Sequence, residues 1–197
     1  PEQPWIESRF TTMSTRIAIN GFGRIGRLVL RSLIEADRDD VEVVSINSPG
    51  ATSVMAHLLE FDSTHGHFDQ PITFGENWMD VGKGQMNISH ERDPSVLPHD
   101  AMDIDIVLEC SGKFNNREKA STHLSAGAKK VLVSAPASAA DFTVVYGVNH
   151  DKLTDEHLVV SNASCTTNCL APMAKVMHNT FGLISGNMTT IHAYTCL

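Results

Sequence analysis

The fold of this chain is decided by residues 16–26, Arg-Ile-Ala-Ile-Asn-Gly-Phe-Gly-Arg-Ile-Gly, where a short apolar run ends in a glycine-rich turn. Helical spacing follows at once, because apolar residues recur at intervals of three and four: Ile25, Leu28, Val29, Leu33 and Ala36. A second apolar run, Val41–Ile46, predicts a strand. Strand, helix and strand within about 30 residues form one βαβ unit, whose crossover makes the strands parallel.

The same alternation continues along the chain. A helix is predicted at Arg117–Leu124, and Pro71–Ser89 looks like a small β excursion. Further strands are predicted at Ile104–Leu108, Lys130–Ser134, Phe142–Val145 and Leu158–Ser161. This order favours a Rossmann-type, doubly wound α/β fold with a mostly parallel sheet.

Composition excludes several classes of protein. Of the 197 residues, 42% are hydrophobic and 19% charged, as in a globular protein, and the net charge of -8 argues against binding to a nucleic-acid backbone. The sequence has no apolar run of the roughly 20 residues that a membrane span needs. The first twelve residues precede Met13 and lack the order of a secretion signal. We therefore expect residues 1–12 to be a non-native or disordered extension, and the four cysteines to be thiols of a cytoplasmic protein.

The glycine-rich turn predicts a dinucleotide site. Gly21, Gly23 and Gly26 have the G-x-G-x-x-G spacing between a predicted strand and a predicted helix. Such glycines allow a tight turn and a close approach of backbone N–H groups to pyrophosphate, which the helix N-terminus also attracts. The pattern alone is weak, since three glycines often do no more than turn the chain. Its position between strand and helix favours the functional interpretation.

Polar turns follow three of the predicted parallel strands directly: Asn47-Ser48-Pro49, Cys110-Ser111-Gly112 and Ser134-Ala135-Pro136. Ligands of open α/β sheets lie outside the carboxyl ends of the strands, so Ser111, Gly112 and Ser134 are predicted cofactor contacts. An NAD site usually has Asp or Glu at the end of the second strand, where this chain has Ser48. Either NAD binding is weakened by a lost hydrogen bond, or NADP is accepted because no charge repels its 2′-phosphate.

A second candidate site surrounds Cys165, in the stretch Ser161–Cys169. Ser164 suits a helix N-cap, so Cys165 would lie in the first helical turn, where free N–H groups and the helix dipole stabilise a thiolate. Pro172 can kink this helix, and Gly182 would end it. The alternatives are a buried structural thiol or half of a metal pair, but Cys165 and Cys169 without a second pair make a poor zinc site. No metal is expected.

His192 lies in the run Met188–Thr195, which reads as a strand. A single histidine on a strand is usually a packed, hydrogen-bonded residue. The presence of Cys165 in the same chain favours a catalytic role for His192, because an activated thiol requires a base or cation nearby.

Several segments together closely resemble glyceraldehyde-3-phosphate dehydrogenases, from about Thr15 to Thr195. They are I-N-G-F-G-R-I-G-R (residues 19–27), F-D-S-T-H-G (61–66), E-R-D-P (91–94), A-G-A-K-K-V (126–131), S-N-A-S-C-T-T-N-C-L-A-P (161–172) and T-T-I-H-A-Y-T (189–195). The cysteine motif is specific to this family and its erythrose-4-phosphate relatives. The resemblance implies a NAD(P)-binding domain at residues 13–163, and at 164–197 the first helix and strand of an incomplete α+β catalytic domain.

The resemblance also implies roles for individual residues. Cys165 would be the nucleophile and His192 its base. Contacts to substrate phosphate and inorganic phosphate would come from Ser164, Thr166 and Thr195. Cofactor contacts would come from Arg24 and Ile25 at the backbone of the cofactor, Ser48 at the adenosine ribose, Arg92 at the adenine and Ser134 at the nicotinamide.

These roles describe a phosphorylating aldehyde dehydrogenase. It would oxidise glyceraldehyde 3-phosphate with NAD or NADP and inorganic phosphate, as a cytoplasmic homotetramer without nucleic-acid or membrane partners. The family continues with Asp-Gln shortly after the position of Thr195, whereas this sequence gives Cys196-Leu197 and stops. We therefore expect the chain to be inactive alone. The rival interpretations are erythrose-4-phosphate oxidation, a nucleotide-binding module without turnover, and a structural partner.

Overall fold

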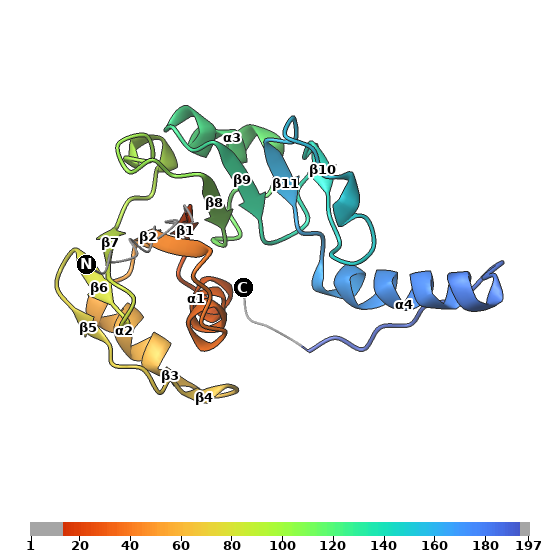
Figure 1. Ribbon diagram of the computed structural model, residues 1–197, viewed down its shortest axis with the longest axis horizontal. Coiled ribbons are helices and arrows are strands. Elements are labelled where there is room, and N and C mark those ends of the chain that lie inside the picture. Colours follow the sequence, from red (N-terminus) through yellow and green to blue (C-terminus); the bar gives the residue numbers. More distant parts are fainter. Residues whose placement is uncertain (1–13, 194–197) are drawn as a thin grey trace, which may run out of the picture.

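The computed structural model describes residues 14–193 of the chain, with its elements arranged as in Figure 1. The strands of the main sheet are β1 (Thr15–Asn20), β2 (Val41–Asn47), β5 (Thr73–Phe74), β6 (Trp78–Asp80), β7 (Gln85–Ser89), β8 (Ile106–Glu109), β9 (Lys130–Val133), β10 (Phe142–Thr143) and β11 (Val159–Ser161). The helices are α1 (Arg24–Glu35), α2 (Thr52–Glu60), α3 (Arg117–Ser125) and α4 (Cys165–Phe181), with 3-10 turns η1 (Pro94–Val96) and η2 (His150–Lys152). A separate hairpin is formed by β3 (Phe61–Asp62) and β4 (Gly66–His67).

The main sheet confirms the doubly wound prediction. Its strand order is β10-β11-β9-β8-β1-β2-β7-β6-β5. Every pair from β10 to β7 is parallel, and only β5 and β6 add antiparallel pairs at one edge. The chain leaves β1 toward β2 and later returns to β8 on the other side of β1. That reversal places a topological switch point, the usual ligand position of such sheets, between β1 and β8.

Two apolar clusters hold helices on opposite faces of the sheet, α1 and α2 in one and α3 in the other, as Figure 1 shows for α1 and α3. Strand residues alternate between them because successive side chains point to opposite faces. Ile19, for example, packs with Leu30 of α1 in one cluster, while its neighbour Ala18 packs with Ala120 of α3 in the other. Burial on both faces explains the nearly continuous apolar strands of the sequence.

The predicted elements up to α4 are confirmed, with ends displaced by one or two residues. The β excursion is more than a side branch, because β7 pairs in parallel with β2 and so extends the main sheet. Helix α2 and the hairpin β3–β4 were not predicted. The buried Arg31 of α1 fixes this hairpin by donating hydrogen bonds to the carbonyls of Gly66 and His67 at 3.0 and 3.2 Å.

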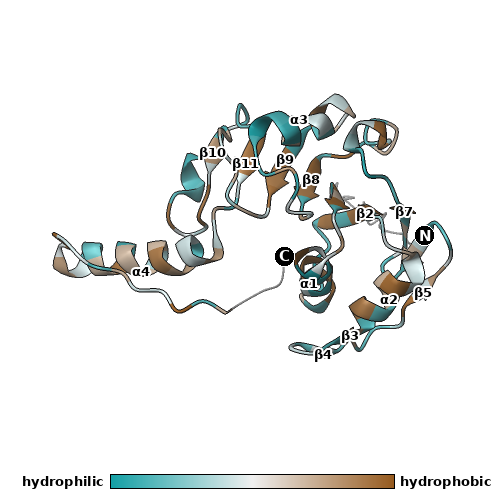
Figure 2. Cartoon of the chain, turned by 180° about the vertical axis from the view of Figure 1, so that it is seen from behind, coloured by the Kyte–Doolittle hydropathy of each residue, from teal (hydrophilic) through white to brown (hydrophobic). Residues whose placement is uncertain are grey.

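Helix α4 begins and ends where the sequence predicts. The Ser164 hydroxyl accepts a hydrogen bond from the Thr167 amide at 3.0 Å, and Gly182 ends the helix in the left-handed conformation. The helix continues through Pro172. Its apolar residues lie along an exposed surface, visible in Figure 2, and none of its residues is buried.

The strand predicted at Met188–Thr195 is wrong for residues 188–193, which form no strand. A strand needs a neighbour that satisfies its backbone N–H and C=O groups. No pairing partner for this run exists within residues 14–193. Of the predicted start of an α+β domain, the structure therefore shows the helix alone.

Candidate active site

A cavity of about 240 Å³ lies at the carboxyl edge of the sheet, at the switch point between β1 and β8. Turns after β1, β2, β7 and β8 form its walls. Five predicted cofactor residues line it together: Gly21, Gly23, Ser48, Arg92 and Ser111. Separate segments of sequence thus meet because parallel strands end at one edge.

The three glycines of the loop have different steric roles. Gly21 has a φ of 94°, and a Cβ there would lie 2.5 Å from the Ser111 backbone. A Cβ on Gly26 would lie 2.2 Å from the Gly21 carbonyl oxygen, so this glycine lets α1 pack against the loop. Gly23 has no heavy atom within 4 Å of an added Cβ and lines the cavity. Its backbone is therefore open to close approach by a ligand, the role of the second glycine in dinucleotide loops.

Arg24 and Ile25 lie at the start of α1 but are not among the residues that line the cavity. The Arg24 guanidinium instead pairs with Asp62, at 2.9 Å from Oδ2. Hydrogen bonds from the His65 and Thr64 amides, and then from Arg24, hold the pKa of Asp62 far below its usual range. Arg24 is thus fixed by the β3–β4 hairpin.

Gly112 and Ser134 also stand outside the set of lining residues. Ser134 follows β9, and its side chain lies near the thiol of Cys110, which does line the cavity. Burial raises the pKa of Cys110 to about 11, so this thiol is protonated and unreactive at neutral pH.

Cys165 and His192 lie in contact although 27 residues separate them. The Cys165 Sγ is 3.2 Å from the His192 Nε2, and the His192 Nδ1 is 2.8 Å from the Ala193 carbonyl oxygen. Because that carbonyl can only accept, Nδ1 carries a proton and Nε2 faces the sulfur. The hydrogen bond from His192, supported by the Thr166 amide, lowers the pKa of Cys165. The same bond to sulfur, followed by that to Ala193, raises the pKa of His192.

The exposed position of Cys165 contradicts the alternative of a buried structural thiol. Ser164 and Thr166 flank it in the first turn of α4, with their hydroxyl oxygens 3.0 Å apart. Within the described residues, no group of three His, Cys, Asp or Glu side chains could hold a metal ion. Thr195 lies outside the described residues.

The cavity is also lined by residues that were not predicted as cofactor contacts. Asn47, Pro49 and Cys110 belong to turns that the sequence placed at this edge, whereas the remaining ones were missed: Asn20, Phe22, Glu91, Lys113 and Phe114. All lie within a few residues of a predicted one, on the same turns. Lys113 is the most informative of them, because it adds a second cation, besides Arg92, to the lining of the cavity. The signal was available, since Lys113 directly follows the Ser-Gly turn after β8.

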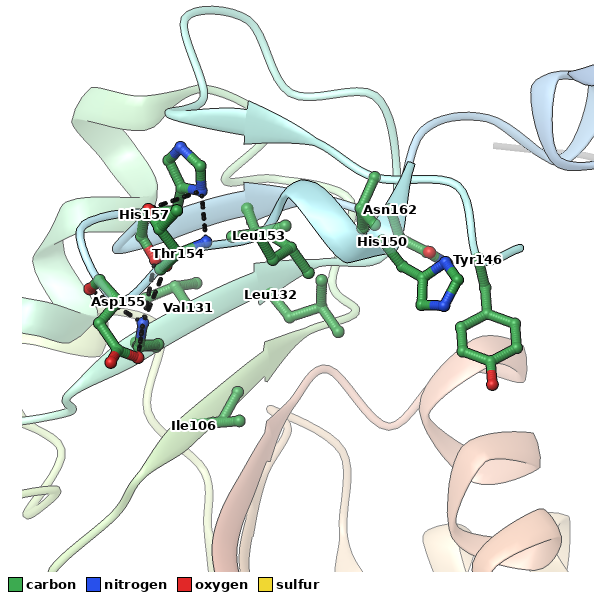
Figure 3. A pocket seen from close by; sticks show the side chains of 13 residues that line it. Ile106, Val131, Leu132, Tyr146, His150, Leu153, Thr154, Asp155, His157 and Asn162 are labelled. Atoms are coloured by element: carbon green, nitrogen blue, oxygen red, sulfur yellow. Dashed lines mark hydrogen bonds and ion pairs between the residues drawn. The ribbon is translucent and has the colours of Figure 1, made fainter. Parts of the chain in front are cut away.

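A larger cavity of about 510 Å³ lies elsewhere, over β9 and β11 and beside η2 (Figure 3). Its floor is apolar, with Val131, Leu132 and Leu153 on one side and Tyr146 at its rim. Lys130 closes one end by donating to the carbonyl of Asp155 at 3.0 Å. None of the predicted site residues lines it, so its size does not make it the active site.

As to membranes, no helix between residues 14 and 193 is long and apolar enough to span one.

The doubly wound sheet, the glycine loop at its switch point and the thiol–imidazole pair define a class: enzymes that combine a Rossmann-type domain with a catalytic cysteine. Comparison with known proteins identifies the family. Residues 15–117 match the family model for the glyceraldehyde 3-phosphate dehydrogenase NAD binding domain, and residues 164–196 match that for its C-terminal domain. The chain belongs to the glyceraldehyde 3-phosphate dehydrogenase family.

Individual relatives agree. The chain is 60% identical to the glyceraldehyde-3-phosphate dehydrogenase of Xanthobacter flavus over 183 residues, which are 93% of this chain and 55% of that protein. It is 56% identical to the Cereibacter sphaeroides enzyme over 93% of the chain and 54% of that protein. For the Thermotoga maritima enzyme the identity is 51%, over 91% of the chain and 54% of that protein. The chain thus spans about half the length of the curated relatives it matches.

Proposed function

We propose that the protein is a phosphorylating glyceraldehyde-3-phosphate dehydrogenase, an oxidoreductase of glycolysis or gluconeogenesis. It would convert glyceraldehyde 3-phosphate, inorganic phosphate and NAD to 1,3-bisphosphoglycerate and NADH. The observation that carries the proposal is the 3.2 Å contact between the Cys165 sulfur and the His192 Nε2, at the start of a helix. An acidic thiol beside a base is what addition to an aldehyde requires.

The lining of the switch-point cavity supports dinucleotide binding. Gly23 leaves its backbone open there, and the positive end of α1 follows directly. Arg92 and Lys113 add cations to the lining. We assign Gly21, Gly23, Ser48, Arg92 and Ser111 as direct contacts. Arg24, Ile25, Gly26, Gly112 and Ser134 remain proposed cofactor-binding residues, although they do not line the cavity. When bound, the nicotinamide ring supplies the hydride acceptor.

The chain's own groups manage the thiol chemistry. His192 Nε2 accepts the thiol proton of Cys165, and the sulfur forms a bond to the aldehyde carbon. The carbonyl electron pair moves to oxygen, which His192 Nε2–H and the N–H groups at the start of α4 stabilise in the resulting thiohemiacetal. Departure of hydride from that carbon leaves a thioester on Cys165.

Phosphate completes the reaction. One of its oxygens adds to the thioester carbon, the carbon–sulfur bond breaks, and Cys165 leaves as a thiolate paired with His192. The product is an acyl phosphate. Ser164, Thr166 and Thr195 would hold the phosphate groups through their hydroxyls, a role that fits the first turn of α4 for the first two.

NADP is accepted beside NAD in this proposal. The Ser48 hydroxyl carries no charge to repel a 2′-phosphate, and Arg92 lines the same cavity. Changing Ser48→Asp should penalise NADP by repulsion and favour NAD through a ribose hydrogen bond. An NADP-to-NAD preference in kcat/KM that stays unchanged would show that Ser48 does not set selectivity.

We further propose a cofactor domain at residues 13–163 and a catalytic segment from residue 164, in a cytoplasmic homotetramer. The boundary is supported by Ala163, whose φ of 57° turns the chain between β11 and α4. The apolar surface of α4 supports association, because exposed apolar surface favours it. Light scattering of the purified protein would test the assembly.

The decisive test of function is product identity. The protein at the full length of its relatives, of which this chain spans about half, is incubated with glyceraldehyde 3-phosphate, phosphate and NAD, and acyl phosphate is trapped with hydroxylamine. The proposal expects NADH and hydroxamate in equal amounts, and neither with Cys165→Ser. NADH without hydroxamate, or a preference for erythrose 4-phosphate, would indicate the non-phosphorylating relative. Dinucleotide binding without any turnover would indicate a binding module.

A further inference from the structure

A buried chain of polar side chains runs beneath the floor of the switch-point cavity. At one end, Asn47 of β2 contacts Glu91, which lies in the loop after β7. Asn47 accepts a hydrogen bond from the Glu91 amide at 2.8 Å and donates one to the Glu91 carbonyl at 2.9 Å. The same Asn47 amide group donates to the Asn20 Oδ1 at 2.7 Å. Both asparagines are buried. The loop that carries Arg92 is thus tied to the end of β1.

Glu109, at the end of β8, continues the chain. Its Oε2 accepts from the Asn20 Nδ2 at 2.5 Å and from the His123 Nε2 at 3.0 Å. Its Oε1 accepts from the Ser111 amide at 2.7 Å and from the Ser111 hydroxyl. The Glu109 side chain is fully buried, as is that of His123 on α3. The Glu109 carboxylate therefore joins two walls of the cavity: the end of β1, through Asn20, and the turn after β8, through Ser111.

The carboxylate is charged despite its burial. Burial alone would raise the pKa of Glu109, but the hydrogen bonds from His123, Ser111 and Asn20 outweigh it and lower the pKa. Behind His123 lies His99, whose Nε2 is 3.1 Å from the His123 Nδ1. Burial, and then the proximity of His123, lower the pKa of His99 to about 4, so His99 is neutral at neutral pH.

A buried charged side chain is weak evidence of a gain in folding stability. An apolar group of similar volume often serves stability as well or better, because desolvation of a charge is costly. What the carboxylate provides here is geometry. It holds the Ser111 backbone where Gly21 must contact it, with so little space that a Cβ on Gly21 would lie 2.5 Å away. Ser111 and Gly21 both line the cavity.

We propose that Glu109, braced by His123, is a positioning residue for the dinucleotide site. It fixes the Ser111 turn directly and the Glu91–Arg92 loop through Asn20 and Asn47, so that the cavity is formed before its ligand binds. This inference rests on the dinucleotide binding proposed above. It gives a shared role to three buried side chains that take no part in the thiol chemistry: Glu109, His123 and His99.

The test compares Glu109→Gln with Glu42→Gln in the 197-residue chain. Gln keeps the shape of Glu but replaces one acceptor oxygen with a donor. Glu42 is a matched control on β2, since its half-exposed carboxylate pairs with Arg16 away from the cavity. NAD affinity is measured by titration calorimetry. We expect Glu109→Gln to weaken it at least about tenfold, and Glu42→Gln to leave it unchanged. Equal affinities in the two variants would overturn the proposal.

Amide hydrogen exchange without ligand separates positioning from a general loss of structure. In Glu109→Gln, peptides covering 110–113 and 89–92 should both exchange faster, while the core strand β9 keeps its protection. Faster exchange at 110–113 alone, or everywhere equally, would contradict the proposal. The exchange experiment tests the positioning role even if the unaltered chain fails to bind NAD. Such a failure would refute the proposed function instead.

If Glu109→Gln does not fold, Ser111→Ala decides the question. It removes one of the two Ser111 donors to Glu109 by truncating a side chain that is only partly buried itself. Slightly faster exchange at 89–92, on the far wall of the cavity, is expected. Unchanged exchange there would show that the polar chain does not couple the two walls.

Discussion

The cavity at the switch point and the thiol pair at α4 are fixed in very different ways. Each wall of the cavity ends a strand of a sheet that is covered on both faces, and buried side chains such as Asn47 and Glu109 tie the walls together. Cys165 and His192 share one hydrogen bond, between a helix without buried residues and an extended segment. The binding geometry is thus over-determined, whereas the catalytic geometry depends on few contacts.

The contrast shows where stability and chemistry reside. The apolar residues of α4 are well exposed, with 55% exposure at Met173 and 76% at Phe181. They contribute little burial energy, so the folding free energy must come from the sheet and its helices. Substitutions in the two regions should therefore have separable effects.

The largest difference is expected in stability. Leu30 on α1 is fully buried, while Met173 on α4 is mostly exposed. Leu30→Ala should lower the free energy of unfolding by about 2–5 kcal/mol through lost burial and the cavity left behind. Met173→Ala should change it by less than about 0.5 kcal/mol. Urea denaturation measures both. Equal losses would mean that α4 is part of the same core.

Two glycines sharpen the comparison inside the cavity. Gly23→Ala should weaken NAD binding by about tenfold to a hundredfold with only a small change in melting temperature, because the ligand would meet the new methyl group while the protein loses only the glycine N-cap of α1. Gly21→Ala should lower both affinity and melting temperature, since its φ is positive and its Cβ would strike the Ser111 backbone. Calorimetric titration and thermal melts separate the two. A stable Gly23→Ala protein with full affinity would remove the glycine loop from the site.

A smaller effect is expected at the start of α4. Ser164→Ala removes the N-cap and should destabilise the helix by about 1 kcal/mol, seen as faster exchange of the Thr167 amide. Ser121→Ala is the matched control, because the Ser121 hydroxyl donates to a carbonyl inside α3 and caps nothing. If both serines gave the same result, the Ser164 cap would have no special role.

Most of the fold was predictable from local patterns. Apolar runs, the glycine turn and helical spacing located the parallel strands and three helices, since each signal lies within one element. Helix α2 was missed because it has no capping side chain at Ala51 and no glycine at its end, the two signals that located α4. The strand at Met188–Ala193 was wrong because composition favours a strand but cannot supply the neighbour that it needs.

The candidate site was predictable at the level of turns. Gly21, Ser48 and Ser111 meet as expected, since the topology of parallel strands decides which turns converge. Side-chain pairing was not predictable. Nothing in the sequence shows that Arg24 pairs with Asp62, or that Glu109 lies between Asn20 and Ser111, because these contacts cross 38 and 89 residues of chain. The buried polar network required the structure.

The measurement that most directly tests the account is the pH dependence of Cys165 alkylation. Iodoacetamide reacts with the thiolate, so the labelling rate falls as pH drops through the thiol pKa. A hydrogen bond from His192 lowers that pKa, and labelling should therefore persist below the usual thiol pKa of about 8.5. In His192→Asn the pH midpoint of Cys165 labelling should move up toward the ordinary thiol pKa.

Mass spectrometry of the labelled peptides, with Cys169 as internal reference, follows each thiol. The account predicts that Cys165 is labelled first and loses this advantage without His192. Preferential labelling of Cys169 or Cys110, or a Cys165 midpoint that ignores His192, would contradict it.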